Sequence, residues 1–168
     1  MRRPLVLSLL LAASCSQQPP TARNESAPTT APSAAANATV SATSPDALAA
    51  KRTVERYFAL IVQKKYAEAR MLWDHDGADS GGDAAALAAA YAAFSKYDPT
   101  VGSPTEIKTV GTTQYIAVAV KAQVREKRSG RENEREGPVL LRRQITRESD
   151  AGAPGAWHLW GIDIREKH

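Results

Sequence analysis

The spacing of apolar side chains changes once along the chain, near Thr105, and this change limits the folds available to it. Before that residue, apolar side chains recur every three or four positions, as on one face of an α-helix. After it, apolar and polar side chains alternate, as in half-buried β-strands. The sequence therefore predicts an α+β fold in which three N-terminal helices pack on an antiparallel sheet of about four strands.

The helical part begins with a strong capping pattern. Ser44 is a good N-cap, Pro45 suits the first helical position, and Asp46 lies near the positive end of the helix dipole. Two further helices are expected, a short one before the Asp74–Gly77 turn and one capped by Asp83. The expected apolar faces are Val54, Tyr57, Phe58, Ile61 and Val62 in the first helix, Tyr66, Ala69, Leu72 and Trp73 in the second, and Leu87, Tyr91 and Phe94 in the third.

The alternating part contains four predicted strands. Ser129-Gly130 is typical of a hairpin turn, and the mixed charges of residues 125–136 indicate a solvated hairpin tip. In the last strand, Trp160, Ile162 and Ile164 are expected to share one face. The predicted strands cover residues 107–110, 115–128, 139–147 and 157–165.

Cys15 is the only cysteine, and it follows an N-terminus typical of exported proteins. Arg2 and Arg3 precede an apolar run over residues 5–13, which is far shorter than the ~20 residues of a membrane-spanning helix. Residues 11–15, Leu-Ala-Ala-Ser-Cys, resemble a bacterial lipobox, with the leucine one position earlier than usual. The resemblance implies a diacylglycerol on Cys15; the alternative is ordinary cleavage that releases a soluble protein.

The resemblance also implies where the chain is anchored. An aspartate after the cysteine often retains such lipoproteins in the inner membrane, and Ser16 stands at that position. We therefore expect a lipid anchor in the bacterial cell envelope, at the outer membrane and facing the periplasm.

Residues 16–44 are almost entirely Ser, Thr, Ala, Pro, Asn and Gln, and Val40 is the only large apolar residue among them. Such a segment cannot bury enough apolar surface to offset the entropy of ordering. The expected organisation is a signal peptide over 1–15, a disordered tether over 16–44 and one folded domain over 45–168.

The charge balance excludes a nucleic-acid partner. The chain has 22 basic and 18 acidic residues, and three of the basic and one of the acidic residues precede Pro45, which leaves a net charge of +2 for the domain with neutral histidines. No phosphate loop, CxxC, HExxH or GxSxG motif is present. We expect no cofactor and no metal.

Three segments resemble the NTF2-like superfamily: 54–61 (Val-Glu-Arg-Tyr-Phe-Ala-Leu-Ile), 66–73 (Tyr-Ala-Glu-Ala-Arg-Met-Leu-Trp) and 157–160 (Trp-His-Leu-Trp). Lys64-Lys65 replaces the usual Gly-Asp type of break between the first two helices. The resemblance implies a cone, in which a strongly bent sheet wraps the first helix, often around a pocket and often dimeric through the outer sheet face. Members include dehydratases, isomerases and non-catalytic binding or accessory domains.

Asp74, His75, Asp76, Asp79 and Asp83 form the only dense acidic cluster. A calcium loop of the EF-hand type needs a glycine at its sixth position and a glutamate at its twelfth, and neither is present. His75 with Asp74 or Asp76 would make a general-base pair, but sequence neighbours on a loop do not face each other. We expect solvated charges and no catalytic residue here.

The candidate ligand-binding residues are on the predicted sheet. Asp163 shares a face with Trp157 in the last strand, whereas His158 lies on the opposite face because of its odd spacing from Asp163. Tyr115 and Trp157 would supply apolar walls, and Arg125 a cation that orients an anion. This face is expected to line a pocket or to form a dimer surface with salt bridges.

These observations favour a lipid-anchored, non-catalytic binding or accessory module. Its expected partners are the membrane, a small apolar or anionic ligand, and a second copy of the chain through the sheet. The alternatives are a small dehydratase- or isomerase-like enzyme, which needs an acid or base in an enclosed cavity, and a structural dimerisation domain, which needs a large apolar sheet face.

Overall fold

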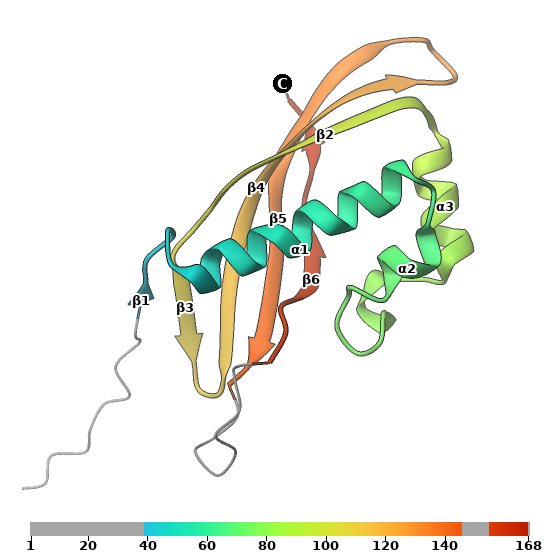
Figure 1. The fold of residues 1–168 in the computed structure, drawn as a ribbon. Helices are drawn as coiled ribbons and strands as arrows, with labels where there is room; N and C mark the ends of the chain where they lie inside the picture. The colour runs from blue at the N-terminus through green and yellow to red at the C-terminus, as the bar shows by residue number, and fades with distance from the viewer. Residues whose placement is uncertain (1–38, 146–154, 168) are drawn as a thin grey trace, which may run out of the picture. The chain divides into compact units, whose positions relative to one another are not determined.

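The computed structural model describes residues 39–145 and 155–167 (Figure 1). The expected signal peptide with Cys15, and the tether up to residue 38, lie outside these residues. The described elements, in chain order, are β1 Thr39–Val40, α1 Pro45–Val62, α2 Tyr66–Arg70, the 3-10 helix η1 Ala78–Ser80, α3 Ala84–Ala92, β2 Phe94–Pro104, β3 Ile107–Val110, β4 Thr113–Glu126, β5 Glu132–Gln144, β6 His158–Ile162 and β7 Arg165–Glu166.

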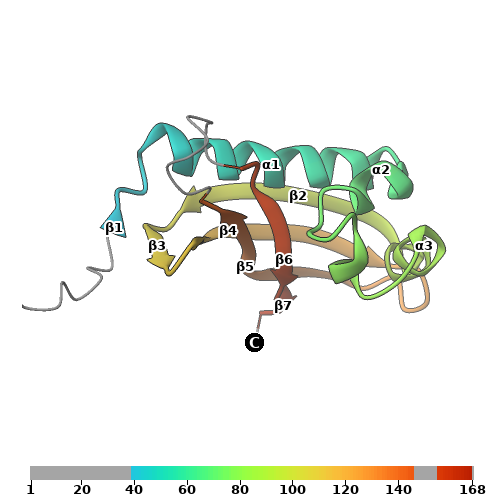
Figure 2. The same ribbon diagram turned by 90° about the horizontal axis from the view of Figure 1, so that it is seen from below.

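Seven described strands form one sheet, and each pair of neighbouring strands is antiparallel. The main order is β1-β3-β4-β5-β6; β2 pairs with β4 beside β3, and β7 pairs with β5. In Figure 1, α1 crosses in front of β4, β5 and β6, and α2 and α3 lie beyond its C-terminal end. Figure 2, from below, shows β2 running alongside α1 and β6 leading into β7 near the C-terminus.

The expected arrangement of three N-terminal helices on about four strands is wrong. Strand β1 precedes α1, and β2 begins at Phe94, which was expected to be on the buried stripe of the third helix. The predicted closing strand is divided into β6 and β7. Strand β2 contains Pro99, Gly102 and Pro104, which interrupt any alternating pattern but are tolerated at a sheet edge.

Helix α1 begins as its capping residues predict. Ser44 is the N-cap, and its hydroxyl oxygen accepts a 3.1 Å hydrogen bond from the backbone N–H of Ala47. Of the predicted apolar face, Tyr57 and Phe58 are among the buried residues of the core, whereas Val62 is 54% exposed. The helix ends at Val62, and Lys64, at φ 59°, turns the chain towards α2.

Two connections hold α1 on the sheet. The buried guanidinium of Arg143, on β5, donates to Asp46 Oδ2 over 2.7 Å and to Gln114 Oε1 over 2.7 Å. Trp157 packs its ring 4.5 Å from that guanidinium and donates to the backbone oxygen of Asp46 over 3.1 Å. The N-terminal end of α1 is therefore fixed to β4, β5 and the segment before β6.

Strand β1 lies inside the segment 16–44 that the composition predicts to be a tether. Thr39 pairs with Lys108 and Val40 with Ile107, and Val40 packs against the hydrophobic core. The ordered chain therefore begins at least six residues before Pro45. No helix in the described part is long and apolar enough to cross a membrane.

Candidate functional site

A cavity of about 300 Å³ lies between α1, α3 and the sheet, and we call it the α3 cavity. It is bounded by side chains from six parts of the chain. Aromatic walls come from Tyr57, Trp73, Tyr91, Phe94 and Tyr97, aliphatic walls from Leu87, Ala90, Ile162 and Ile164, and one charge from Arg135.

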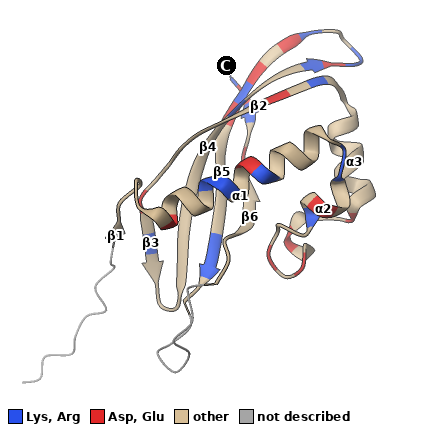
Figure 3. Cartoon of the chain, viewed as in Figure 1, with Lys and Arg blue, Asp and Glu red and all other residues tan. Residues whose placement is uncertain are grey.

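Helix α3 leaves room for the cavity because it packs loosely. Its sequence, Ala-Ala-Ala-Leu-Ala-Ala-Ala-Tyr-Ala, favours helix intrinsically, and Asp83 caps it by accepting from the backbone N–H of Ala86 over 2.8 Å. None of its nine residues is fully buried, and Tyr91, whose hydroxyl points towards Tyr57, is half-buried. Figure 3 shows α3 without a charged residue, so an apolar helix covers the cavity without filling it.

The aromatic rings of the cavity contact one another edge to face. Tyr91 and Tyr97 have ring centroids 4.9 Å apart at 87°, and Tyr57 and Trp73 have centroids 6.2 Å apart at 76°. Phe94 is 5.9 Å from Tyr97. These contacts fix the walls, because edge-to-face aromatic pairs add stabilisation beyond the area that they bury.

The tyrosine hydroxyls of the cavity stay protonated at neutral pH. Burial raises the pKa of Tyr97 to about 12. Burial also raises the pKa of Tyr57 and of Tyr91, whose hydroxyl oxygens are 3.5 Å apart. These groups can therefore donate hydrogen bonds but cannot act as bases near pH 7.

Two further donors in the cavity wall have no partner. The indole N–H of Trp73 is buried and makes no well-aligned hydrogen bond among residues 39–145 and 155–167, although it lies close enough to the Tyr57 hydroxyl to lower the pKa of that group in part. Nε of Arg135 has no partner within the described residues, and the nearest acid of Arg135 is Glu126, with an N–O distance of 4.0 Å. The Arg135 guanidinium lies over the Phe94 ring, 4.9 Å from its centroid. Buried donors without partners are costly, so they point to an acceptor that a ligand supplies.

The described lining of the α3 cavity contains neither a carboxylate nor an imidazole. Its polar groups are hydroxyls, an indole N–H and a guanidinium, all of which donate hydrogen bonds at neutral pH. This chemistry suits the binding of an acceptor or an anion. It does not provide the base that proton abstraction requires.

The acidic cluster forms a structural ion network around a cation. Arg142, on β5, donates through Nε to Asp74 and through Nη2 to Asp79 over 2.9 Å, while His75 Nδ1 is 3.2 Å from Asp79. Asp74, His75 and Asp79 have ligand atoms within 4.8 Å of one another, as a metal site would need. However, the Arg142 guanidinium already supplies the positive charge among them.

The pKa of Asp74 also indicates a structural role for this network. Burial raises the pKa of Asp74, but hydrogen bonds from Arg142 and from the His75 backbone N–H outweigh it and hold the pKa below its usual value. His75 and Asp76 both have positive φ, 51° and 54°, which turns the chain sharply after Asp74. The loop therefore docks against β6, where the Asp74 backbone N–H donates to Leu159 O over 3.0 Å.

The structure does not bring the four predicted ligand-binding residues together. Tyr115 packs on Trp160 at 5.6 Å, and Arg125, ten residues along β4, donates to Glu132 over 2.9 Å. Trp157 is buried beside Arg143, and Asp163 is exposed and accepts from Arg165 over 2.5 Å. Ten residues of strand span about 34 Å, so Tyr115 and Arg125 cannot serve one small site.

The α3 cavity was missed by reasoning from the sequence because its aromatic residues were assigned to helix faces in a core. Arg135 was expected to be in the solvated hairpin tip. One signal was available in the sequence. Arg135 lies four and six residues before the apolar Val139 and Leu141, and side chains an even number of residues apart in a strand share a face, so Arg135 is expected to point inward with them. A cation on the buried face of a strand needs either a partner within the protein or a ligand.

Comparison of the chain with known protein families, with curated proteins and with solved structures finds no match.

Proposed function

We propose that this chain is a lipid-anchored protein of the bacterial envelope whose folded domain is a non-catalytic module that binds a small molecule in the α3 cavity. The observation that carries the proposal is the make-up of that cavity: aromatic walls, buried donors without partners, and no described carboxylate or imidazole. The lipid anchor, the outer-membrane location and the kinship with NTF2-like domains rest on the sequence alone.

The absence of a base from the described lining argues for binding over the dehydratase or isomerase alternative. An enzyme of that kind needs a group poised to accept a proton near the working pH. The raised pKa values of Tyr57, Tyr91 and Tyr97 keep all three hydroxyls protonated there. The small volume, at the lower end of the ~300–1,000 Å³ of ligand pockets, favours a compact ligand.

Binding in the cavity can be tested with two matched ligands, naphthalene-1-acetate and its neutral amide, titrated into the full chain and followed by two-dimensional NMR. We expect at least one to bind the wild type. Leu87→Trp, which fills the cavity from α3, should abolish that binding, and Leu48→Trp, on an exposed position of α1, should not. Failure of both ligands to bind, or equal binding to Leu87→Trp, would contradict the proposal.

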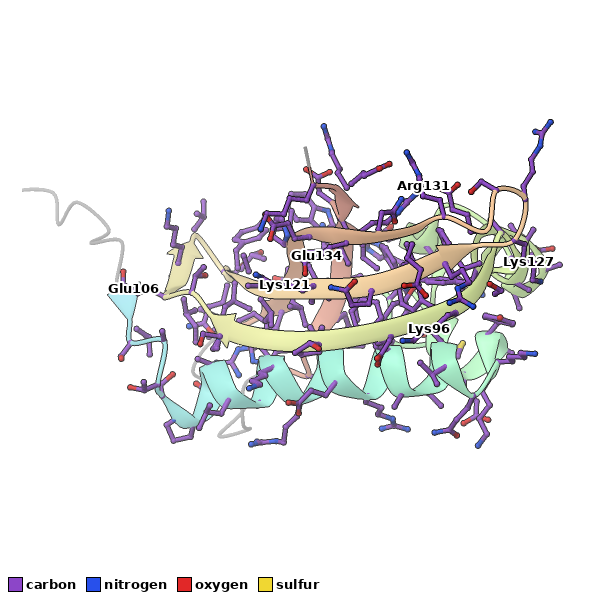
Figure 4. The ribbon with its side chains drawn as sticks, turned by 90° about the horizontal axis from the view of Figure 1, so that it is seen from above. Lys96, Glu106, Lys121, Lys127, Arg131 and Glu134 are labelled. Carbon is purple, nitrogen blue, oxygen red and sulfur yellow. The ribbon has the colours of Figure 1, made fainter. Side chains whose placement is uncertain are left out.

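A second candidate function, dimerisation through the sheet, is favoured by the outer sheet face. An apolar groove of about 270 Å³ lies there, bordered by Tyr115, Leu140 and Trp160, which is 45% exposed. Beyond the groove, β4 exposes the basic Lys121 and Arg125, and β5 exposes acidic residues paired with them. Figure 4 shows Lys121 and Glu134 on these neighbouring strands. If two copies stack face to face about a two-fold axis parallel to the strands, the basic side chains of β4 in each copy lie over the acidic side chains of β5 in the other copy.

Light scattering after gel filtration tests this second candidate. We expect a dimer mass for the wild type and a monomer mass for Trp160→Lys, which places a charge in the groove. Val110→Lys is the matched control, because Val110 is 62% exposed on β3 and does not line the groove. A monomeric wild type would exclude a stable sheet-mediated dimer.

A further inference from the structure

We infer that the ligand of the α3 cavity is a small monocarboxylate with an aromatic or cyclic hydrocarbon body, whose carboxylate is bound by Arg135. This inference rests on the proposed function and specifies the chemical class of the ligand. It follows from the unused hydrogen-bonding capacity of one cation, from one orphaned indole N–H, and from the apolar remainder of the walls.

Arg135 is the only charged residue in the described lining of the cavity, and its buried Nε has no hydrogen-bond partner among the described residues. Its guanidinium makes none of the side-chain hydrogen bonds found in the described residues, and its one ion pair, with Glu126, is loose at 4.0 Å. Glu126 is itself occupied, since it accepts from Ser129 Oγ over 2.7 Å and lies 3.8 Å from Arg131. A carboxylate matches the planar fork of a guanidinium and binds it through two hydrogen bonds.

The position of Arg135 is fixed by packing and not by an acid. Its guanidinium lies over the Phe94 ring at 4.9 Å, and its strand is paired on both sides, with Ala122 of β4 and with Glu166 of β7. The side chain is 30% exposed, so it is partly desolvated at the edge of the cavity. An ion pair formed there is stronger than one on an open surface.

The rest of the cavity recognises an apolar body with one more acceptor. Trp73 is 7% exposed, and its indole N–H makes no well-aligned hydrogen bond among the described residues, the nearby Tyr57 hydroxyl included. The aliphatic and aromatic walls offer contacts to a ring, and a single guanidinium balances one negative charge. A dianion such as a phosphate ester would leave a buried charge uncompensated, which is costly.

The experiment compares naphthalene-1-acetate with naphthalene-1-acetamide, which have the same ring and differ in charge. We expect the full-length wild type to bind the acetate at least about tenfold more tightly than the amide. In Arg135→Gln the ratio of the two dissociation constants should fall to about one, because the amide loses little and the acetate loses its partner. The indole N–H signal of Trp73, identified by its absence in Trp73→Phe, should shift on binding.

Arg131→Gln is the matched control, since it removes the same charge from the same strand region. Arg131 lies before β5 and bonds to Glu166 over 2.9 Å, and Figure 4 shows it near the hairpin end of the sheet, on the side away from α1. The preference for acetate should persist in this variant. Arg135→Lys, which keeps the charge without the fork, should retain part of the preference and covers the case in which Arg135→Gln does not fold.

The outcomes separate the two proposals. Equal affinity for acetate and amide in the wild type, with both lost in Leu87→Trp, would overturn the carboxylate inference and leave the binding function standing. A preference for acetate that survives in Arg135→Gln, or disappears equally in Arg131→Gln, would also overturn the inference. If neither ligand binds the wild type, the binding function itself fails.

Discussion

Among single residues, Arg143 shows how a charge can be buried without being a site. It lies on the core side of β5, and its guanidinium bonds to Asp46 and Gln114 and stacks on Trp157. Arg135 is on the same face of the same strand and lies over the Phe94 ring, yet its buried Nε has no hydrogen-bond partner in the described residues and its one ion pair is 4.0 Å long. Because of this contrast, we assign a structural role to Arg143 and a binding role to Arg135.

The Asp46–Arg143 pair makes stability depend on pH in the acid range. The hydrogen bond from Arg143 lowers the pKa of Asp46 below 3.8, its ordinary value. A carboxyl group with a lowered folded-state pKa contributes stability above its unfolded pKa and loses it as pH falls through the folded value. We therefore expect Asp46→Asn to lower the free energy of unfolding at pH 7, and the gap to the wild type to shrink progressively below about pH 4.

Urea unfolding at several pH values measures this gap. Glu55→Gln is the control, because Glu55 is exposed and its ion pair with Lys51 spans 3.8 Å. Exposed pairs of this kind contribute little. A gap for Asp46→Asn that stays constant from pH 7 to pH 2.5 would show that the ion pair is not its cause.

Gly137 is another residue whose role appears only in the structure. A Cβ at this position would lie 1.8 Å from the carbonyl oxygen of Asp163, since the chain after β6 crosses directly over β5. We expect Gly137→Ala to lower the free energy of unfolding by about 1–3 kcal/mol through this overlap. Gly161→Ala, whose Cβ would be 3.5 Å from Leu140, should have a much smaller effect in the same denaturation experiment. Similar losses in both variants would contradict this account.

At the level of secondary-structure elements, the sequence predicted helices and strands in which apolar side chains recur at a regular spacing. It missed the strands that lack such a spacing. The start of α1, the cap of α3 and the strand at 107–110 agree with the prediction. Strand β2 could not be predicted, because Phe94–Pro104 is an edge strand with two prolines and no regular alternation. Strand β1 has only two residues, and its pairing with β3 depends on tertiary contacts that local sequence does not encode.

Strand β6 shows why an alternating pattern can place a residue on the wrong face. Trp160 was expected to share a buried face with Ile162 and Ile164. A register shift between Leu140 and Leu141 inserts an extra residue into β6, so Trp160 is 45% exposed and packs on Tyr115. A one-residue bulge reverses the facing of every later residue, and it cannot be read from residue types. The four candidate ligand-binding residues lie apart for a related reason: they were grouped by sheet face, while their distances along the strands were unknown.

Strand β1 leads to a prediction about truncation. Removing residues 1–38 should leave the melting temperature unchanged, because residues 16–38 have no large apolar side chain to pack and residues 1–15 are the proposed signal peptide. Removing residues 1–44 also deletes β1, the packing of Val40 and the Ser44 cap, whose loss alone costs about 1 kcal/mol. We expect the longer truncation to melt at least about 4 °C below the shorter one. Equal melting temperatures would mean that β1 does not stabilise the domain.

For the molecule as a whole, the fold keeps every described charge except that of Arg135 out of the lining of the proposed ligand site. Figure 3 shows charges of both signs on the β4–β5 hairpin and acidic residues in the loop between α2 and α3, whereas α3 has none. The hairpin charges pair across the strands, as Lys121 does with Glu136 and Arg125 with Glu132. A net charge close to neutral over the domain gives no field that would attract polyanions. The two proposed functions therefore rest on the cavity and on the apolar groove of the outer face, and not on a charged surface.

The last prediction concerns where the whole molecule is located. If Cys15 carries a diacylglycerol, Cys15→Ala should move the protein from the membrane fraction to the soluble fraction of the bacterial envelope. Each buried methylene contributes about 0.8 kcal/mol, so two acyl chains anchor stably where a single short chain would be released. Ser16→Ala, which leaves the cysteine intact, should stay with the membrane. An unchanged distribution of Cys15→Ala after fractionation, with the domain still folded, would rule out the lipid anchor and leave the binding function of the α3 cavity to be judged on its own experiment.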